Sequence, residues 1–445
     1  MKAPLKPKSL PALLDAYAGS LPKILKMGIG PTVAGEYLHW DQLRHREPPP
    51  GLNHEEWWLG IKLARTPHFR EIPLKDASGK PFRYSMPDGV LRILHEIDSK
   101  AGGRIELPEQ ITNRETRDRY VVKSIMEEAI TSSQLEGAST TRQAAVAMLR
   151  SGRKPKDTSE RMILNNYRAI KNIREMTKQP LVPETVLMLH KVLTAETLED
   201  PAAAGRLQLP DELRVHVADN ATQVIVHAPP PAEQLPHRLE MMCGFANEPD
   251  DGQSFMHPII RSILLHFWLA YDHPFVDGNG RTARTLFYWA MLSRNYWLFD
   301  YVSISRILKD APAKYAKSYL FTETDDNDAT YFIIYQLQVL LRAIEDLYKY
   351  LERKTVEVES VEKHLKSVSA FNHRQIALLS HASRHPGAEY SIASHQESNN
   401  VAYATARADL LELEEKSLLI KRISGRKKQL FVVPDDFQER LQKIA

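Results

Sequence analysis

The stretch that most constrains this chain is the run from His273 to Arg284, with the sequence HPFVDGNGRTAR. Apolar segments precede it over residues 262–271 and follow it over 285–292, so the pattern predicts a helix, a loop and a second helix. A loop that feeds Gly-Asn-Gly into a helix start leaves several backbone N–H groups unpaired and aimed at one point. These groups and the positive end of the helix dipole favour an anion, most simply a di- or triphosphate.

The residue types within the loop suit such a site. Gly278 and Gly280 allow positive φ and let phosphate oxygens approach the backbone without an intervening Cβ. Asp277 offers a hard oxygen ligand for a magnesium ion that already carries phosphate oxygens. His273, just before the loop, can take a proton from an incoming hydroxyl near neutral pH.

Two cations follow the loop. Arg281 and Arg284 lie in the first turn of the second predicted helix, where a positive charge is unfavourable unless an anion binds there. The alternative interpretation is a helix-capping Gly-Asn-Gly turn followed by surface arginines. We expect an anion site, because both arginines fall beside the same unpaired backbone N–H groups.

The run resembles the signature of the Fic family, H-x-F-x-[D/E]-G-N-G-R-x-x-R, at every defined position. Proteins of this family transfer the AMP portion of ATP to a hydroxyl side chain of a target protein, with magnesium. The resemblance extends over roughly residues 115–345 and implies a mainly α fold, a Fic-type helical bundle with a β-hairpin flap. It implies the following roles: general base, His273; metal ligand, Asp277; anion hole, Gly278, Asn279 and Gly280; phosphate ligands, Arg281 and Arg284; core anchor of the loop, Phe275.

Composition excludes several other classes of protein. A length of 445 residues predicts two or three domains, and a formal charge of +3 gives no global argument for nucleic acid or membrane binding. The one cysteine, Cys243, excludes an internal disulfide framework and falls in an apolar stretch, where a buried structural thiol is expected. No apolar run is long enough to span a bilayer, and no secretory signal begins the chain, so we expect a cytoplasmic protein.

Residues 1–110 form an N-terminal extension that is rich in proline and tryptophan and predicted to be irregular. One helix stands out over residues 54–65, with Asn53 as its N-cap. The tryptophans Trp40, Trp57 and Trp58 could form a substrate surface. We expect instead that they pack the extension against the catalytic core.

Residues 111–353 read as a helical catalytic domain. Two alternating segments, 213–217 and 222–227, interrupt the helical pattern and predict a β-hairpin. The resemblance implies that this hairpin, around residues 213–228, is a flap that holds a target segment by strand-like pairing beside the catalytic His. The alternative is an ordinary structural hairpin.

A second pattern, Ser132-x-x-x-Glu136-Gly137, lies on a predicted helix around residues 124–137. Taken alone it is a solvated helix face with a glycine C-cap. Many Fic proteins carry [S/T]-x-x-x-E-[G/N] on an inhibitory helix, and the resemblance implies that Glu136 pairs with Arg284 and blocks seating of the ATP γ-phosphate. Because the pattern is in the same chain, the inhibition would act in cis.

Residues 354–367 are predicted to be a helical or flexible linker, and residues 368–445 resemble a winged helix-turn-helix module. In this segment, predicted helices over 372–385, 391–398 and 402–416 precede strands over 418–423 and 429–433. If the module binds DNA, the residues facing the groove are Asn399, Tyr403, Thr405 and Arg407, and those facing the phosphates are Arg426, Lys427 and Lys428. Winged helices also serve as protein-docking or dimer modules, and both roles stay open.

The sequence therefore predicts an autoinhibited protein adenylyltransferase that uses ATP and Mg²⁺ and modifies Ser, Thr or Tyr hydroxyls of a protein substrate. Self-modification, a homodimer and DNA binding by the C-terminal segment stay open, and no membrane partner is expected. The nearest alternative is a Fic-type enzyme that removes AMP from a modified target with Glu136. Another alternative is a DNA-binding regulator whose Fic domain senses a nucleotide.

Overall fold

The computed structural model describes residues 3–101, 114–214, 217–218, 225–249, 255–367, 371–385, 387–424 and 428–443. The chain divides into two compact units, Met1–Ile105 with Lys123–Glu345, and Glu106–Val122 with Asp346–Ala445. Each unit is mainly helical, with a few short strands. Among the described residues, no helix is both long and apolar enough to cross a membrane.

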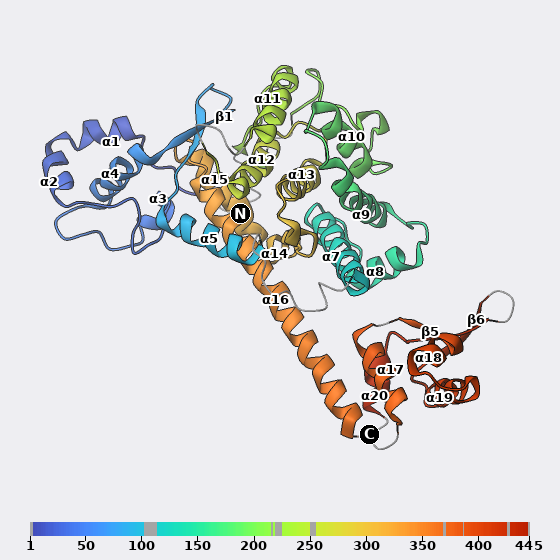
Figure 1. The fold of residues 1–445 in the computed structure, drawn as a ribbon. Helices are drawn as coiled ribbons and strands as arrows, with labels where there is room; N and C mark the ends of the chain where they lie inside the picture. The colour runs from blue at the N-terminus through green and yellow to red at the C-terminus, as the bar shows by residue number, and fades with distance from the viewer. Residues whose placement is uncertain are drawn as a thin grey trace. The chain divides into compact units, whose positions relative to one another are not determined.

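Two buried helices form the centre of the first unit, α12 (Pro258–Asp272) and α13 (Asn279–Ser293) (Figure 1). Apolar side chains cover α12 on all sides, which is typical of a helix surrounded by protein. Buried members of α12 include Ile260, Leu264, Phe267 and Trp268. The predicted helix, loop and helix are therefore present, and the loop between them is supported from both ends.

Other helices of this unit surround the central pair. The contacts of α13 include α9 and α10, and those of α12 include α11. The bounds of the surrounding elements are α7 Arg114–Leu135, α8 Arg142–Ser151, α9 Thr158–Met176, α10 Pro183–Thr194, η3 Pro201–Ala203, η4 Ala232–Gln234, α11 Leu235–Asn247, η5 Trp297–Asp300, α14 Ile304–Asp310 and α15 Pro312–Thr324. Cys243 is buried in α11, as expected for a structural thiol.

The predicted hairpin is present in the part that the structure describes. Strands β3 (Val217–Ala218) and β4 (Ile225–His227) pair antiparallel, with Val217 opposite His227. Residues 215–216 and 219–224, which complete the expected flap, lie outside the described residues.

The N-terminal segment is more regular than the sequence predicted. It contains α1 Leu10–Ala16, η1 Ala18–Ser20, α2 Leu21–Lys26, α3 Trp40–Leu43, α4 His54–Arg65, η2 Thr66–His68, β1 Arg70–Lys75, β2 Pro81–Tyr84 and α5 Asp88–Ala101. The expected helix over residues 54–65 is confirmed, and Asn53 caps it by accepting a hydrogen bond from the Glu56 N–H. The hairpin of β1 and β2 was not predicted, since proline and glycine at its ends concealed the short alternation.

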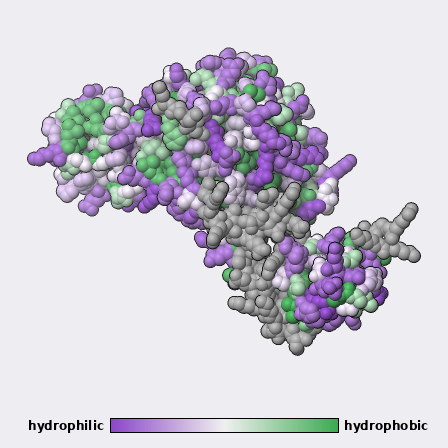
Figure 2. Space-filling view, in the orientation of Figure 1, coloured by the Kyte–Doolittle hydropathy of each residue, from purple (hydrophilic) through white to green (hydrophobic). Residues whose placement is uncertain are grey.

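The expectation that the tryptophans pack this segment against the catalytic core was incomplete. Trp57 and Trp58 are buried with Leu13, Ile24 and Leu43 in a core that the N-terminal segment makes by itself. Hydrophobic residues also gather on part of the surface of this segment (Figure 2). Leu25 of α2 is largely exposed.

Polar side chains attach the N-terminal segment to the rest of the first unit. Lys62 on α4 donates a hydrogen bond to Asp325 (Nζ to Oδ1, 2.7 Å), and both side chains are only 1% exposed. Arg65 donates to the Tyr331 hydroxyl at 2.8 Å. Although burial by itself would raise the pKa of Asp325, the Lys62 ammonium holds that pKa below its ordinary value.

The long helix α16 (Thr330–Ser367) begins in the first unit and continues through residues 354–367, so the expected linker is helical. The second unit contains α17 His373–Arg384, β5 Glu389–Ser391, α18 Ile392–Asn399, α19 Tyr403–Glu415, β6 Ile420–Ser424, β7 Lys428–Val432 and α20 Phe437–Gln442. Its antiparallel sheet has the order β5-β7-β6. Its apolar core includes Leu379, Leu410, Leu413 and Phe431.

We expect Lys62→Ala to destabilise the protein by about 3–5 kcal/mol, because the substitution leaves the Asp325 carboxylate buried without its cation. Lys80→Ala is the matched control. Lys80 pairs with Asp326 at 3.0 Å but is 47% exposed, so its loss should cost less than about 1 kcal/mol. Urea unfolding followed by tryptophan fluorescence measures both variants, and equal losses would contradict the prediction.

Candidate active site

The loop from His273 to Gly278 joins α12 to α13, and both of its ends have left-handed backbone. His273 ends α12 with φ +46°, and Gly278 precedes α13 with φ +81°. Positive φ is uncommon for a residue with a Cβ and persists where surrounding contacts fix it. Here the His273 N–H donates to the Leu269 carbonyl at 3.0 Å, so the last turn of α12 holds the candidate base.

The interior of the loop is fastened by Asn279. Its Oδ1 accepts from the Phe275 N–H at 2.9 Å, and its Nδ2 donates to the Phe275 carbonyl at 2.7 Å. Phe275 has no exposed surface, which agrees with its expected place as a core anchor. Asn279 therefore positions the loop, in addition to its expected place in the anion hole.

The His273 ring has one nitrogen that faces an acceptor. Nδ1 lies 3.4 Å from the Ala270 carbonyl, so it carries the proton and Nε2 keeps a lone pair. Burial lowers the pKa of His273 to about 4, and the nearby His227 and Arg214 also lower it, whereas Glu136 raises it. The neutral ring that a general base requires is thus the stable form near pH 7.

Arg214, just before the hairpin, braces this end of the loop. Its guanidinium donates to the Asp272 carbonyl at 2.7 Å, the His273 carbonyl at 3.0 Å and the Pro230 carbonyl at 3.0 Å. Arg214 therefore links the two ends of the hairpin to the backbone of His273, the candidate general base. No local sequence pattern marks this role of Arg214, because it contacts residues 58 and 59 positions away in the chain.

Gly280 does not use the positive φ that a glycine allows. It lies inside the first turn of α13, and only Gly278 is left-handed. What Gly280 supplies is space: a Cβ there would lie 2.2 Å from Glu136 Oε1 and 3.0 Å from Arg284 Nη1. The first N–H groups of a helix have no intrahelical acceptors, so the space above Gly280 suits an anion.

Arg281 is fully buried on the other side of this helix start. Its Nη1 donates to the Leu193 carbonyl and its Nη2 to Asp277 Oδ2, both at 3.1 Å. Its Nε is buried and has no protein partner in the structure. The Asp277 carboxylate is 55% exposed, so one carboxylate both neutralises Arg281 and faces solvent.

Arg284 is held by the C-terminal end of α7. Its Nε donates to Ser132 Oγ at 2.9 Å, and its Nη2 donates to the Ser132 carbonyl at 3.0 Å and to Glu136 Oε1 at 2.7 Å. The expected contact between Glu136 and Arg284 is therefore present. Gly137 follows with φ +94°, as a glycine after a helix end does.

The Glu136 carboxylate occupies the space directly above Gly280, as the short distance to a Cβ at that position shows. A carboxylate oxygen thus lies where the helix start and Arg284 would both attract a phosphate. Burial by itself would lower the pKa of Arg284, but Glu136 raises it above its ordinary value. The negative end of α7 meets the positive end of α13 at this point.

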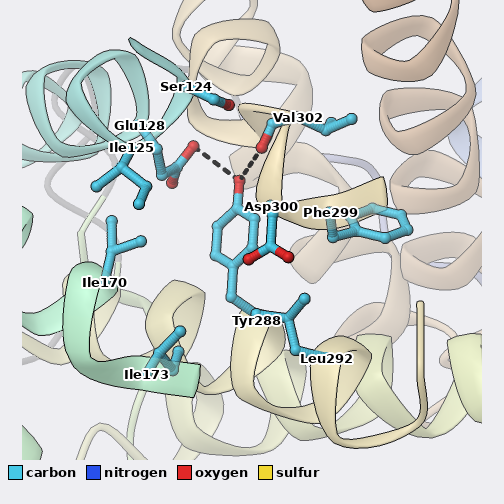
Figure 3. A pocket seen from close by; sticks show the side chains of 10 residues that line it. All are labelled: Ser124, Ile125, Glu128, Ile170, Ile173, Tyr288, Leu292, Phe299, Asp300 and Val302. Atoms are coloured by element: carbon cyan, nitrogen blue, oxygen red, sulfur yellow. Dashed lines mark hydrogen bonds between the residues drawn. The ribbon is translucent and has the colours of Figure 1, made fainter. Parts of the chain in front are cut away.

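A second carboxylate fixes α7 two turns earlier (Figure 3). Glu128 is buried, and its Oε2 accepts from the Tyr288 hydroxyl at 2.9 Å, Ser303 Oγ at 2.8 Å and the Ser305 N–H at 3.0 Å. Ser124, Ile125 and Glu128 of α7 line a narrow pocket whose lining includes no residue of the run from His273 to Arg284. Glu128 thus holds α7 against α13, the helix that carries Arg284.

Part of this chain is similar to known proteins. Residues 180–291 match the model of the Fic/DOC family. Residues 180–291 form a Fic/DOC family domain. A crystal structure of a Fic family protein from Desulfovibrio desulfuricans G20 shares the fold, with a TM-score of 0.51, 19% identity, and coverage of 79% of this chain and 97% of that one.

Curated relatives of the Fic domain match over shorter stretches. The protein adenylyltransferase Fic of Nematostella vectensis is 43% identical over 68 residues, which are 15% of this chain and 16% of the relative. Protein adenylyltransferase fic-1 of Caenorhabditis briggsae is 32% identical over 105 residues, 23% of this chain and 18% of the relative. The chain therefore covers less than a quarter of the length of either relative.

Among the described residues of the Fic domain and its surroundings, no group of three or more His, Cys, Asp or Glu side chains could hold a metal by itself. Asp277 supplies one exposed carboxylate, which pairs with Arg281. Magnesium commonly binds through one or two carboxylates and substrate phosphates, so this donor set fits Mg²⁺ held together with a nucleotide.

We expect the His273 ring to stay neutral from pH 8 down to about pH 5, because burial lowers its pKa to about 4. Long-range ¹H–¹⁵N NMR of the histidine rings measures the protonation state, and His273→Gln identifies the signal. A titration midpoint near the ordinary value of about 6.5 would show that burial does not control this group.

Proposed function

We propose that this protein is an autoinhibited protein adenylyltransferase that transfers AMP from ATP to a Ser, Thr or Tyr hydroxyl of a protein. The observation that carries the proposal is that Glu136 fills the space above Gly280 while it pairs with Arg284. A site built for a phosphate, next to a neutral histidine, would need its own carboxylate removed before ATP could be seated productively.

The reaction follows from the residues around this space. Gly278, Asn279 and Gly280 would receive the phosphates on the N–H groups of the helix start, with Arg281 and Arg284 as phosphate ligands. Nε2 of His273 would take the hydroxyl proton as the hydroxyl oxygen attacks the α-phosphorus. The bond from the α-phosphorus to the bridging oxygen then breaks, and pyrophosphate leaves. Positioning and charge neutralisation would supply most of the acceleration.

Mg²⁺ would be held by the Asp277 carboxylate together with ATP oxygens, and when bound it neutralises phosphate charge. Asp277 must then face two cations, since its Oδ2 already accepts from Arg281. One carboxylate would then serve both the metal and the Arg281 guanidinium.

Inhibition in cis would come from Ser132, Glu136 and Gly137 at the end of α7. Arg284 has three acceptors there, and the carboxylate is the only charged one. Displacement of Glu136 would free both the space above Gly280 and the guanidinium fork. A helix end therefore acts as an internal substitute for the γ-phosphate.

Removal of AMP from a modified target is the second candidate activity. Glu136 is 26% exposed, and its negative charge raises the pKa of the His273 ring. In that position a carboxylate could orient a water molecule instead of blocking ATP. The same residue would then be required for activity.

The second unit would be a winged-helix module. Its order of helices and strands and its sheet order β5-β7-β6 support this assignment. Tyr403 is 55% exposed at the start of α19, and Ile423 is 74% exposed on β6. Arg426 and Lys427, expected at phosphates, lie outside the described residues.

The test is incorporation of α-labelled ATP into the protein itself and into lysate proteins. Glu136→Gly should raise labelling by roughly tenfold or more over the unaltered protein, and His273→Ala in that background should abolish it. Glu127→Gln, on the same helix but paired with Arg142, is the matched control and should leave labelling unchanged.

If Glu136→Gly stays unlabelled, the transferase proposal fails. AMP removal is then tested with a target that has been adenylylated beforehand. Release of AMP by the unaltered protein, lost in Glu136→Gly, would support the second candidate.

A further inference from the structure

His190 is a buried titratable residue that the proposed reaction does not use. It lies on α10 with no exposed surface, outside the run from His273 to Arg284. His190 differs from an ordinary core histidine because it lies directly against the loop that carries Asp277.

Both ring nitrogens of His190 are engaged by backbone groups. Nδ1 lies 3.0 Å from the Gly205 nitrogen, and this N–H can only donate. Nδ1 therefore accepts, and the ring proton is on Nε2, which lies 2.9 Å from the Asp277 carbonyl. The Gly205 contact thus selects the tautomer that can donate to Asp277.

The ring also fits closely against the loop. It stacks on Phe275 with centroids 3.8 Å apart and an angle of 6° between the planes. A Cβ at Gly278 would lie 3.4 Å from His190 Nε2 and 2.7 Å from Thr194 Cγ2. Residues 275–278 of the loop therefore pack against His190 and Thr194 of α10.

We propose that His190 is a positioning residue for the Asp277 carboxylate, a role that rests on the proposed function. Asp277 has an exposed side chain, and its carbonyl is held from below by the Nε2–H of His190. With this peptide group fixed, the carboxylate is presented toward solvent and toward Arg281 instead of rotating with the loop. Groups that orient a metal ligand commonly affect metal affinity and activity by about 10- to 100-fold.

Two amide substitutions, both of which remove the ring that stacks on Phe275, separate the Nε2 donor from the Nδ1 acceptor. In His190→Gln the amide nitrogen can take the place of Nε2 and still donate to the Asp277 carbonyl. In His190→Asn the amide reaches only the place of Nδ1, so the bond to Asp277 is lost. Both variants are made in the Glu136→Gly background, and the circular dichroism spectrum and Tm of each are compared with the parent.

His190→Asn should lower kcat for AMP transfer by about tenfold or more and weaken Mn²⁺ binding by about tenfold, while His190→Gln stays within about threefold of the parent. Mn²⁺ binding is measured by electron paramagnetic resonance with a non-hydrolysable ATP analogue. A general loss of folded protein would lower kcat without changing the Mn²⁺ affinity of the folded fraction.

Equal behaviour of the two variants, whether both impaired or both active, would overturn the proposal. ¹⁵N shifts of the His190 ring in the unaltered protein give an independent check, and a proton on Nδ1 would also overturn it. The proposed function fails separately, if the Glu136→Gly parent does not transfer AMP.

Discussion

Two guanidiniums with almost no exposed surface constrain the architecture around α13. A buried cation is costly unless acceptors surround it, so each arginine requires a partner element. Arg281 obtains the Leu193 carbonyl of α10 and the Asp277 carboxylate, whereas Arg284 obtains Ser132 and Glu136 at the end of α7. The need to give both buried arginines acceptors therefore explains why α7 and α10 pack against α13. It also explains where Asp277 and Glu136 lie.

The same requirement explains why a carboxylate of the chain itself lies at the start of α13. The positive end of α13 and Arg284 together attract negative charge, and Glu136 provides it from within the chain. Under the proposed function, Glu136 would both stabilise the empty site and compete with the phosphates of ATP. Buried Glu128, on the same helix, keeps the substitute in place through contacts with Tyr288 and Ser305.

The loop itself depends on contacts from three directions. Asn279 fastens Phe275 within the loop, His190 supports Phe275 and Asp277 from below, and Arg214 holds the carbonyls of Asp272 and His273. None of these contacts involves the groups assigned to bond making. They fix the backbone, so the base and the carboxylate can remain partly exposed and still keep their directions.

The sequence by itself determined the features that depend on neighbours a few residues apart. The helices on either side of the loop, the capped helix His54–Arg65, the helix His373–Arg384 and the left-handed Gly278 follow from periodicity, caps and glycine. The contact of Glu136 with Arg284, 148 residues away in the chain, was expected only through the family resemblance.

Tertiary structure decided the features that arise between distant segments. His190 and Asp277 are 87 residues apart, and Arg214 and His273 are 59 apart, so no local pattern marks either contact. The requirement at Gly280 for space instead of positive φ depends on where the end of α7 lies. The separate core of the N-terminal segment also could not be predicted from the sequence, because its apolar residues are spaced across short helices and turns. Local rules act within about one helical turn, whereas these contacts exist only after the helices have packed.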